Sequence, residues 1–370
     1  MKKGLLIISK LMALCLLSAT ILLVQFDFAQ AQHSSKKDIE ANILNYLHAK
    51  NSAKVTGDLD NLRADLEHIT SSEIQDKAIS EADREYYNTM QQDEDYYTGE
   101  ETTIQLLSEP QTIKGGKISV FVEENSILYL STDGGPDKTE QRVEHIMILS
   151  KAGKGVWHIV SDIIKDEPKP LTPPPGSKPV PQDTLSTQVA PKGLLPLNDQ
   201  NDAFGAISLQ TAYYNGSAAA SYAYTWALSR NPAYRSFAAD CTNFVSQAVR
   251  AGNWWDVSGW YLSMEAWWYN YLNQSRPWVN AHYWYLFTYS RPRGYIARYF
   301  NQMQIGDILQ MDFNRDGYVD HSMVVTAKNA SGTIYLSYHT TDTRNRSISS
   351  ILSAYPNANY YGWRIYSAIN

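Results

Sequence analysis

The sequence predicts an α+β protein with two folded domains behind a short leader. The length of 370 residues exceeds that of a typical single domain. In the first half, charge-rich segments with helical spacing precede a run of alternating apolar segments. The second half differs in composition, because nine of the 10 tryptophans lie beyond residue 200. We therefore expect a smaller α+β domain followed by a second, aromatic-rich α+β domain.

Residues 1–31 are typical of a secretory signal peptide. Lys2 and Lys3 precede an apolar run, and Ala-Gln-Ala at residues 29–31 offers a small-x-small cleavage site. An uncleaved membrane anchor is the alternative, although Lys10 interrupts the apolar run. No later stretch is apolar and long enough to span a bilayer, so we expect a secreted or cell-wall-associated protein without stable membrane insertion.

The two halves of the chain differ in charge. Residues 32–200 contain 17 Lys+Arg and 28 Asp+Glu, a balance of −11, whereas residues 201–370 contain 12 and 9, a balance of +3. A mildly basic domain can approach an anionic cell wall, but this charge is too small to indicate nucleic-acid binding. Only Cys241 remains after the leader, which excludes an internal disulfide and marks the thiol as a candidate reactive group.

The first domain is predicted over residues 32–166. Residues 32 to about 85 show helical spacing, and residues 101–165 form apolar or alternating segments separated by KGGK, DGGPD and KAGKG. Helices followed by a strand meander on one curved antiparallel sheet resemble the nuclear transport factor 2-like cone fold. The histidines of this domain lack the spacing of metal ligands, so we assign it no chemistry.

Residues 167–196 are predicted to be a linker rich in Pro, Ser and Thr. Such a composition favours an extended, semi-rigid chain, which we expect to hold the two domains apart. The second domain is predicted over residues 197–370.

Cys241 begins the helix around which the second domain is organised. In ADCTNFVSQAVRAG, residues 239–252, Asp240 is the expected N-cap, Cys241 the first helical residue and Gly252 the C-terminal stop. The unpaired N–H groups and the dipole of a helix N-terminus favour a thiolate, so we predict a nucleophile with a lowered pKa. The alternative is a buried, inert cysteine.

Two histidines are candidate partners of this thiol. The segments VDHSMVVTA and TIYLSYHT are predicted to pair as a hairpin around a loop at residues 328–332. That register places His321 directly opposite His339, so that one imidazole could orient the other. We predict Cys241 as nucleophile, His321 as general base and acid, and His339 as the orienting residue. A slip of one residue would put the rings on opposite faces, and each histidine alone is compatible with a structural role.

Residues 253–300 hold the densest aromatic content of the chain. Such rings could line a groove that stacks sugar rings or glycan-linked peptide, or they could build a core under an irregular segment. The candidate substrate-binding residues are Trp254, Trp255, Trp267 and Trp268.

A second motif, D-x-N-x-D-G-x-x-D, matches most of a calcium-binding loop. Met323 stands where the bidentate glutamate is expected, so a polar turn is the alternative. We expect no other cofactor. The candidate calcium ligands are Asp312, Asn314, Asp316 and Asp320.

Three motifs, DCTNFVSQ, DGYVDHSMVV and YHTTDTRNR, resemble in order and spacing the bacterial putative amidase domain family. The resemblance covers residues 205–368. It implies a papain-like cysteine amidohydrolase, related to cell-wall cysteine endopeptidases and to CHAP amidohydrolases. By motif, the nucleophile falls on Cys241, the base on His321 and the third residue on His339, with Asp342 or Asn345 as alternatives for the third.

The expected function is that of a secreted cysteine amidohydrolase, which cleaves amide or peptide bonds through a thioester. The expected partner is peptidoglycan or another peptide or amide substrate, and no nucleic acid. Two alternatives remain open at this point: a catalytically inactive cell-wall-binding module, and an amine acyltransferase with the same Cys–His pair.

Overall fold

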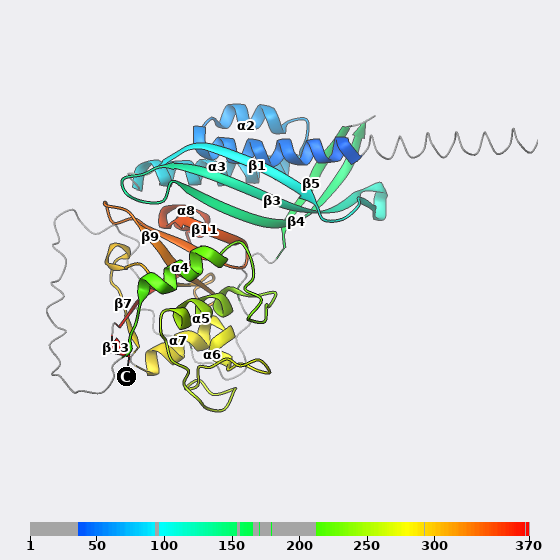
Figure 1. Cartoon of the computed structure of the whole chain (residues 1–370). Coiled ribbons are helices and arrows are strands. Elements are labelled where there is room, and N and C mark those ends of the chain that lie inside the picture. The colour runs from blue at the N-terminus through cyan, green and yellow to red at the C-terminus, as the bar shows by residue number, and fades with distance from the viewer. Residues whose placement is uncertain are drawn as a thin grey trace, which may run out of the picture.

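In the computed structural model, two units of mixed helix and strand are joined edge to edge (Figure 1). The predicted α+β class is confirmed. The predicted leader lies outside the described residues, and so does the predicted linker apart from residues 170 and 179. None of the described helices is both long and apolar enough to cross a membrane. The structure describes residues 36–92, 96–153, 156–165, 170, 179, 212–291, 293–366 and 368–369.

The N-terminal unit consists of helices followed by antiparallel strands, as predicted. The helices lie against one face of the sheet, and apolar side chains from both form a buried core (Figure 1). The helices are residues 36–56, α2 (Leu59–Leu66) and α3 (Ser72–Gln92). The strands are β1 (Tyr96–Leu106), β2 (Gln111–Thr112), β3 (Ile118–Ser131), β4 (Lys138–Gly153) and β5 (Val156–Ile164), with the 3-10 turn η1 (Lys114–Gly116) between β2 and β3.

In the C-terminal unit a second antiparallel sheet has the strand order β11-β10-β9-β8-β12-β7. Its helices are α4 (Gly216–Trp226), α5 (Cys241–Ala251), α6 (Arg276–Val279), α7 (Ala281–Ser290) and α8 (Ile348–Ala354), with the 3-10 turn η2 (Phe300–Gln302). Its strands are β7 (Gly294–Ile296), β8 (Ile308–Asp312), β9 (His321–Lys328), β10 (Ile334–Tyr338), β11 (Asp342–Ser347) and β12 (Asn359–Ile365), while β6 (Ala212–Tyr213) and β13 (Ala368–Ile369) form a separate pair.

This second sheet separates two apolar cores. Successive side chains of a strand point to opposite faces of the sheet. Val324 of β9 packs on one face with residues of helices α4, α5, α6 and α7. Met323 and Val325 pack on the other face with residues of α8. The core on the α5 side is rich in tryptophan, and the core on the α8 side is mainly aliphatic and tyrosine. Residues at the start of β9 therefore lie between helix α5 and the opposite core.

The two sheets continue into one another through strands β4 and β11. Arg142 pairs with Asp342 and Glu140 with Arg344 in an antiparallel register. Both pairs also form ion pairs, each with a nitrogen-to-oxygen distance of 2.6 Å. The expectation that the linker holds the domains apart is therefore wrong. The edge of β11 has backbone groups that need partners, and β4 supplies them.

Candidate active site

Helix α5 begins and ends where the sequence predicts. It spans Cys241–Ala251, with Asp240 at the N-cap and Gly252 at the C-cap. Phe244 and Val249 on its apolar face are fully buried. The capping prediction differs in one respect, because the Asp240 side chain does not cap the helix and makes other contacts.

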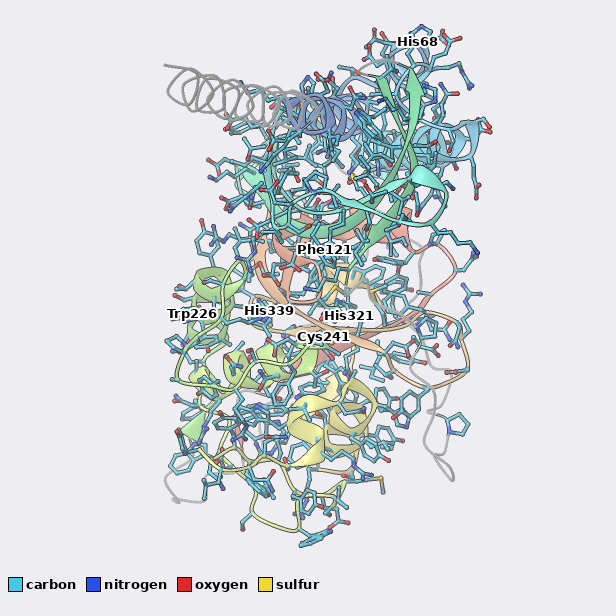
Figure 2. The ribbon with its side chains drawn as sticks, turned by 90° about the vertical axis from the view of Figure 1, so that its right-hand side faces the viewer. His68, Phe121, Trp226, Cys241, His321 and His339 are labelled. Atoms are coloured by element: carbon cyan, nitrogen blue, oxygen red, sulfur yellow. The ribbon has the colours of Figure 1, made fainter. Side chains whose placement is uncertain are left out.

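The Cys241 thiol lies against the beginning of strand β9. Its Sγ is 4.0 Å from the carbonyl oxygen of Asp320, the residue that precedes His321. It is also 3.7 Å from Oγ1 of Thr242. The same Thr242 hydroxyl lies 3.3 Å from Oγ of Ser322, which fixes the first turn of α5 to β9. Figure 2 labels Cys241 and His321 at this junction.

The thiol is protonated at neutral pH in this geometry. Burial raises the pKa of Cys241, with a further contribution from the Asp240 carboxylate, while Thr242 and the backbone of Ser322 act in the opposite direction. Only 6% of the residue is exposed. The prediction of a lowered pKa is wrong for this state, since loss of hydration outweighs the N-terminal position.

His321 is a buried, neutral imidazole. The residue is 2% exposed, and its Nδ1 has no hydrogen-bond partner among the described residues. Its ring meets the Tyr338 ring edge to face, with a centroid distance of 5.2 Å. Burial lowers the pKa of His321 to about 3. The ring is therefore neutral at neutral pH, and burial makes it a weaker base than an exposed histidine.

The predicted pairing of His321 with His339 is wrong. Tyr335 lies opposite Ala327, and a bulge then shifts the register so that Ser337 lies opposite Val324. The hairpin exists, but an offset of one to two residues carries His339 beyond the end of β10. An irregularity of this kind has no clear sequence signal.

The two rings also lie on different faces of the sheet. His321 contacts Tyr338, which belongs to the core on the α8 side. His339 packs against Phe244 of α5, with a centroid distance of 4.1 Å, on the opposite side. His339 therefore cannot orient His321 directly, which contradicts the prediction.

His339 instead contacts Asp240, the residue that precedes Cys241. Its Nδ1 lies 2.6 Å from Oδ2 of Asp240, and its Nε2 lies 2.8 Å from the carbonyl oxygen of Trp226. The other oxygen of Asp240 accepts hydrogen bonds from the Phe237 N–H at 2.9 Å and from the Asn243 amide at 2.8 Å. Asp240 is fully buried. Sequence reasoning assigned Asp240 only a capping role, and its position directly before Cys241 was the available signal.

The charged network continues into the N-terminal unit. Nε of Arg230 lies 3.4 Å from Oδ2 of Asp240, and Nη1 of Arg230 lies 2.9 Å from Oδ2 of Asp342. The same Asp342 oxygen lies 2.6 Å from Nη2 of Arg142 on β4. Asp342 is therefore engaged by two arginines. Asn345, the other alternative for the third residue, accepts a hydrogen bond from the Thr326 hydroxyl at 2.9 Å.

The four predicted substrate-binding tryptophans divide into two pairs. Trp254 and Trp267 are 2% and 0% exposed and pack edge to face in the core, so a groove-lining role is wrong for them. Trp255 is 65% exposed. Trp268 is partly exposed, and its Nε1 donates to the carbonyl oxygen of Gly259 at 3.0 Å. Only Trp255 and Trp268 remain candidates for contact with a substrate.

The calcium-like motif folds as a hydrogen-bonded turn. Asp312 accepts from the Gly317 N–H at 2.8 Å, and Asp316 accepts from the Tyr318 N–H at 2.7 Å. Asp320 accepts from the N–H of Phe313, and Asn314 donates to Asp316. Among the residues that the structure describes, no group of three or more His, Cys, Asp or Glu side chains could hold a metal ion. These contacts are those of a polar turn.

Part of the C-terminal unit is similar to known proteins. Residues 213–363 match the family model described as "Putative amidase domain". Two Bacillus subtilis (strain 168) proteins are similar over 151 residues. "Uncharacterized protein YhbB" is 29% identical over 40% of this chain and 47% of that protein, and "Uncharacterized protein YjcM" is 32% identical over 36% of this chain and 32% of that protein. The match thus spans less than half the length of either relative. No solved structure matches the chain.

Proposed function

We propose that this protein is a cysteine amidohydrolase with Cys241 as its nucleophile, since residues 213–363 match the family model described as "Putative amidase domain". One observation carries the proposal. The thiol lies at the start of α5 against the first residues of β9, where His321 keeps an unpartnered Nδ1. Acyl transfer by a cysteine requires a thiol and a neutral imidazole that can take its proton.

The reaction proceeds through a thioester. Sγ of Cys241 attacks the amide carbonyl carbon, and His321 takes the thiol proton. The backbone N–H of Cys241, at a helix N-terminus, donates to the oxyanion of the tetrahedral intermediate. His321 then protonates the leaving amine as the carbon–nitrogen bond breaks. Water attacks the thioester, His321 receives its proton and returns it to Sγ, and the carboxylic acid product leaves.

Asp240 and His339 act as positioning residues in this scheme. The Asp240 N–H donates to Oγ1 of Thr340 at 3.2 Å, and its carboxylate contacts His339. These contacts fix the residue that leads into Cys241 through both its backbone and its side chain. Fixing that backbone fixes the oxyanion donor and the direction of the thiol.

The proposed substrate is a peptide amide of peptidoglycan, met outside the cell. Secretion follows from the leader predicted at residues 1–31. The positive balance of residues 201–370 favours contact with an anionic wall. The exposed ring of Trp255 offers a surface on which sugar rings can stack.

Digestion of purified peptidoglycan tests this function. We expect the mature protein to release peptides with new free amino groups, identified by mass spectrometry, and Cys241→Ala to release none. Products that carry an added amine would indicate acyl transfer instead of hydrolysis. Absence of new amino groups with both proteins would contradict the hydrolase.

A cell-wall-binding module is the second candidate, favoured by two exposed tryptophans of the C-terminal unit, Trp255 and Trp260. In that case, wall pull-down should survive Cys241→Ser and fail when Trp255 is replaced by alanine. The hydrolase alone predicts that Cys241→Ser loses product formation.

A further inference from the structure

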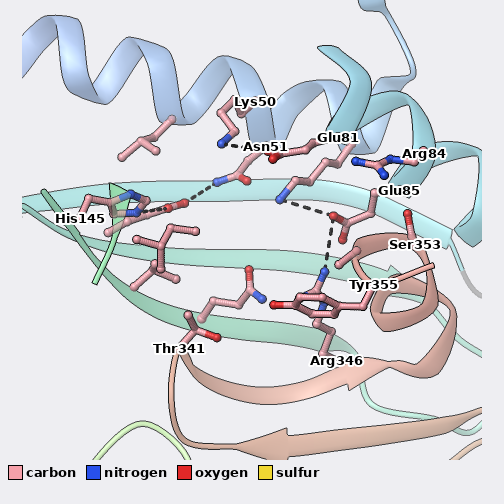
Figure 3. A pocket seen from close by; sticks show the side chains of 17 residues that line it. Lys50, Asn51, Glu81, Arg84, Glu85, His145, Thr341, Arg346, Ser353 and Tyr355 are labelled. Carbon is pink, nitrogen blue, oxygen red and sulfur yellow. Dashed lines mark hydrogen bonds and ion pairs between the residues drawn. The ribbon is translucent and has the colours of Figure 1, made fainter. Parts of the chain in front are cut away.

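A cavity of about 180 Å³ lies between the two units (Figure 3). On one side it is lined by Lys50 and Lys54 of helix 36–56. On the other side it is lined by Thr341, Arg346 and Tyr355 of the C-terminal unit. Neither unit alone encloses this space. Its volume accommodates on the order of ten water molecules, or a small organic molecule.

Lys50 and Lys54 face the cavity with their hydrogen-bonding capacity largely unused. Each side chain is 15% exposed. Nζ of Lys50 lies 3.5 Å from Glu81 and 3.9 Å from Asp162, and Nζ of Lys54 lies 3.6 Å from Glu85. These distances exceed those of ordinary hydrogen bonds, and an ammonium group has three donors. Two like charges one helical turn apart also repel each other.

The carboxylate near Lys54 is already occupied by closer donors. Glu85 accepts from the Ser350 hydroxyl at 2.6 Å and from the Tyr97 hydroxyl at 3.2 Å. Arg346 also lies 3.7 Å from Glu85. The Lys54 ammonium therefore shares an acid that other groups already satisfy.

Asp162, one of the two carboxylates near Lys50, is compensated in the same way. His145 lies between Asp162 at 2.7 Å and Glu124 at 3.1 Å. Hydrogen bonds to these two acids, which outweigh burial, raise the pKa of His145 to about 9. Asp162 also accepts from the Tyr46 hydroxyl at 3.1 Å. The cavity is lined by five basic residues and three acidic ones, so positive charge is in excess there: Lys50, Lys54, Arg84, His145 and Arg346 against Glu81, Glu85 and Glu124.

We propose that this cavity is a binding site for a small anion that carries a carboxylate or phosphate group. The anion accepts hydrogen bonds from the ammonium groups of Lys50 and Lys54. Thr341 and Tyr355 close the opposite wall, and Figure 3 shows them across the cavity from Lys50. A buried ammonium pair is strongly stabilised by such a ligand, because it replaces lost hydration with direct acceptors.

The bound ligand would stabilise the contact between the two units. It would also lie next to the segment that contacts Asp240, the residue before the thiol. It contacts residues of both units, so its binding energy adds to the strand pairing of β4 and β11. Thr341 follows Thr340, whose Oγ1 accepts the hydrogen bond from Asp240. The anion site itself is independent of whether Cys241 is a nucleophile.

Calorimetric titration of the full chain tests the site with three probes: inorganic phosphate, acetate and glutamate, each at constant ionic strength. We expect saturable binding of at least one probe together with a higher melting temperature. Preference for phosphate or for the carboxylates identifies the anion class. Binding should weaken at least tenfold in Lys54→Gln and in Lys50→Gln.

Lys77→Gln is the matched control, because Lys77 pairs with the same Glu81 at 3.8 Å from a side chain that is 60% exposed. The Lys77→Gln variant should bind the anion probe as tightly as the unmodified protein. Tyr355→Phe, which keeps the ring, should weaken binding severalfold and decides the matter if a lysine variant does not fold. The proposal fails if none of the three probes binds, or if the cavity variants bind as tightly as Lys77→Gln.

Discussion

Oδ2 of Asp240 lies 2.6 Å from Nδ1 of His339, and this contact connects the residue before the thiol to the end of strand β10. Both side chains are almost completely buried, at 0% and 1% exposure. The carboxylate also holds the Phe237 N–H and the Asn243 amide. Much of the geometry at the start of α5 therefore depends on one buried acid.

Replacement of Asp240 by alanine should destabilise the protein by roughly 3–5 kcal/mol, because His339 and the neighbouring donors lose their acceptor in a buried setting. Urea unfolding monitored by circular dichroism measures this loss. Asp256→Ala is the control, since its pair with Arg250 is about one-third exposed and should contribute less than about 1 kcal/mol. Equal losses in the two variants would show that the buried network contributes no more to the free energy of unfolding than the partly exposed pair does.

The bounds of α5 and the existence of the β9–β10 hairpin could be predicted from sequence, because capping residues and apolar periodicity are local signals. The relation between His321 and His339 could not. It depends on a bulge after Tyr335, and such a shift moves every later side chain relative to its partner. The Asp240–His339 contact joins residues 99 positions apart, so no local pattern indicates it.

The thiol of Cys241 should react slowly with iodoacetamide in the native protein near pH 6. Burial raises its pKa and covers it, so the alkylation rate should rise as pH increases beyond the ordinary thiol range of about 8.5. Mass spectrometry of timed samples measures the rate, with urea-unfolded protein as the accessible reference. Rapid labelling at pH 6 would show instead that a thiolate is present before substrate binds.

The buried His321 should make stability fall in mild acid. Its folded pKa of about 3 is below the unfolded value of about 6.5, so the unfolded chain binds more protons between these limits. Stability is therefore fully present above pH 6.5 and is lost as pH falls towards 3. Between pH 7.5 and pH 5 the loss from this group is about 2 kcal/mol.

His321→Asn is the matched variant for that measurement, because asparagine does not titrate. Urea unfolding at pH 7.5 and pH 5 should show the unmodified protein losing about 2 kcal/mol more than the variant. The same acid-induced loss in both proteins would mean that His321 is already protonated, or is hydrated, in the folded state.

His145 should have the opposite pH dependence. Its folded pKa of about 9 exceeds the unfolded value of about 6.5, so its contribution is full below pH 6.5 and is lost as pH rises through 9. His145→Gln should cost roughly 3–5 kcal/mol at pH 6, because Glu124 and Asp162 lose the cation between them. The cost should shrink by about 3 kcal/mol at pH 10.

His48→Gln serves as the control for His145, since the His48 side chain is 60% exposed, whereas that of His145 is 3% exposed. Its cost should stay below about 1 kcal/mol. A pH-independent cost for His145→Gln would indicate that the buried ring is neutral.

The tryptophans of the aromatic segment should separate into stabilising and substrate-contacting residues. Trp254 and Trp267 are 2% and 0% exposed, so replacement of either by alanine should leave a cavity and cost roughly 3–5 kcal/mol. Trp255 is 65% exposed, so Trp255→Ala should leave the melting temperature nearly unchanged. If its ring stacks on the substrate, KM should rise severalfold while kcat changes little, as expected for binding that is equal in ground and transition states. Unchanged KM in Trp255→Ala would remove this ring from the substrate surface, and unchanged stability in Trp254→Ala would contradict its place in the core.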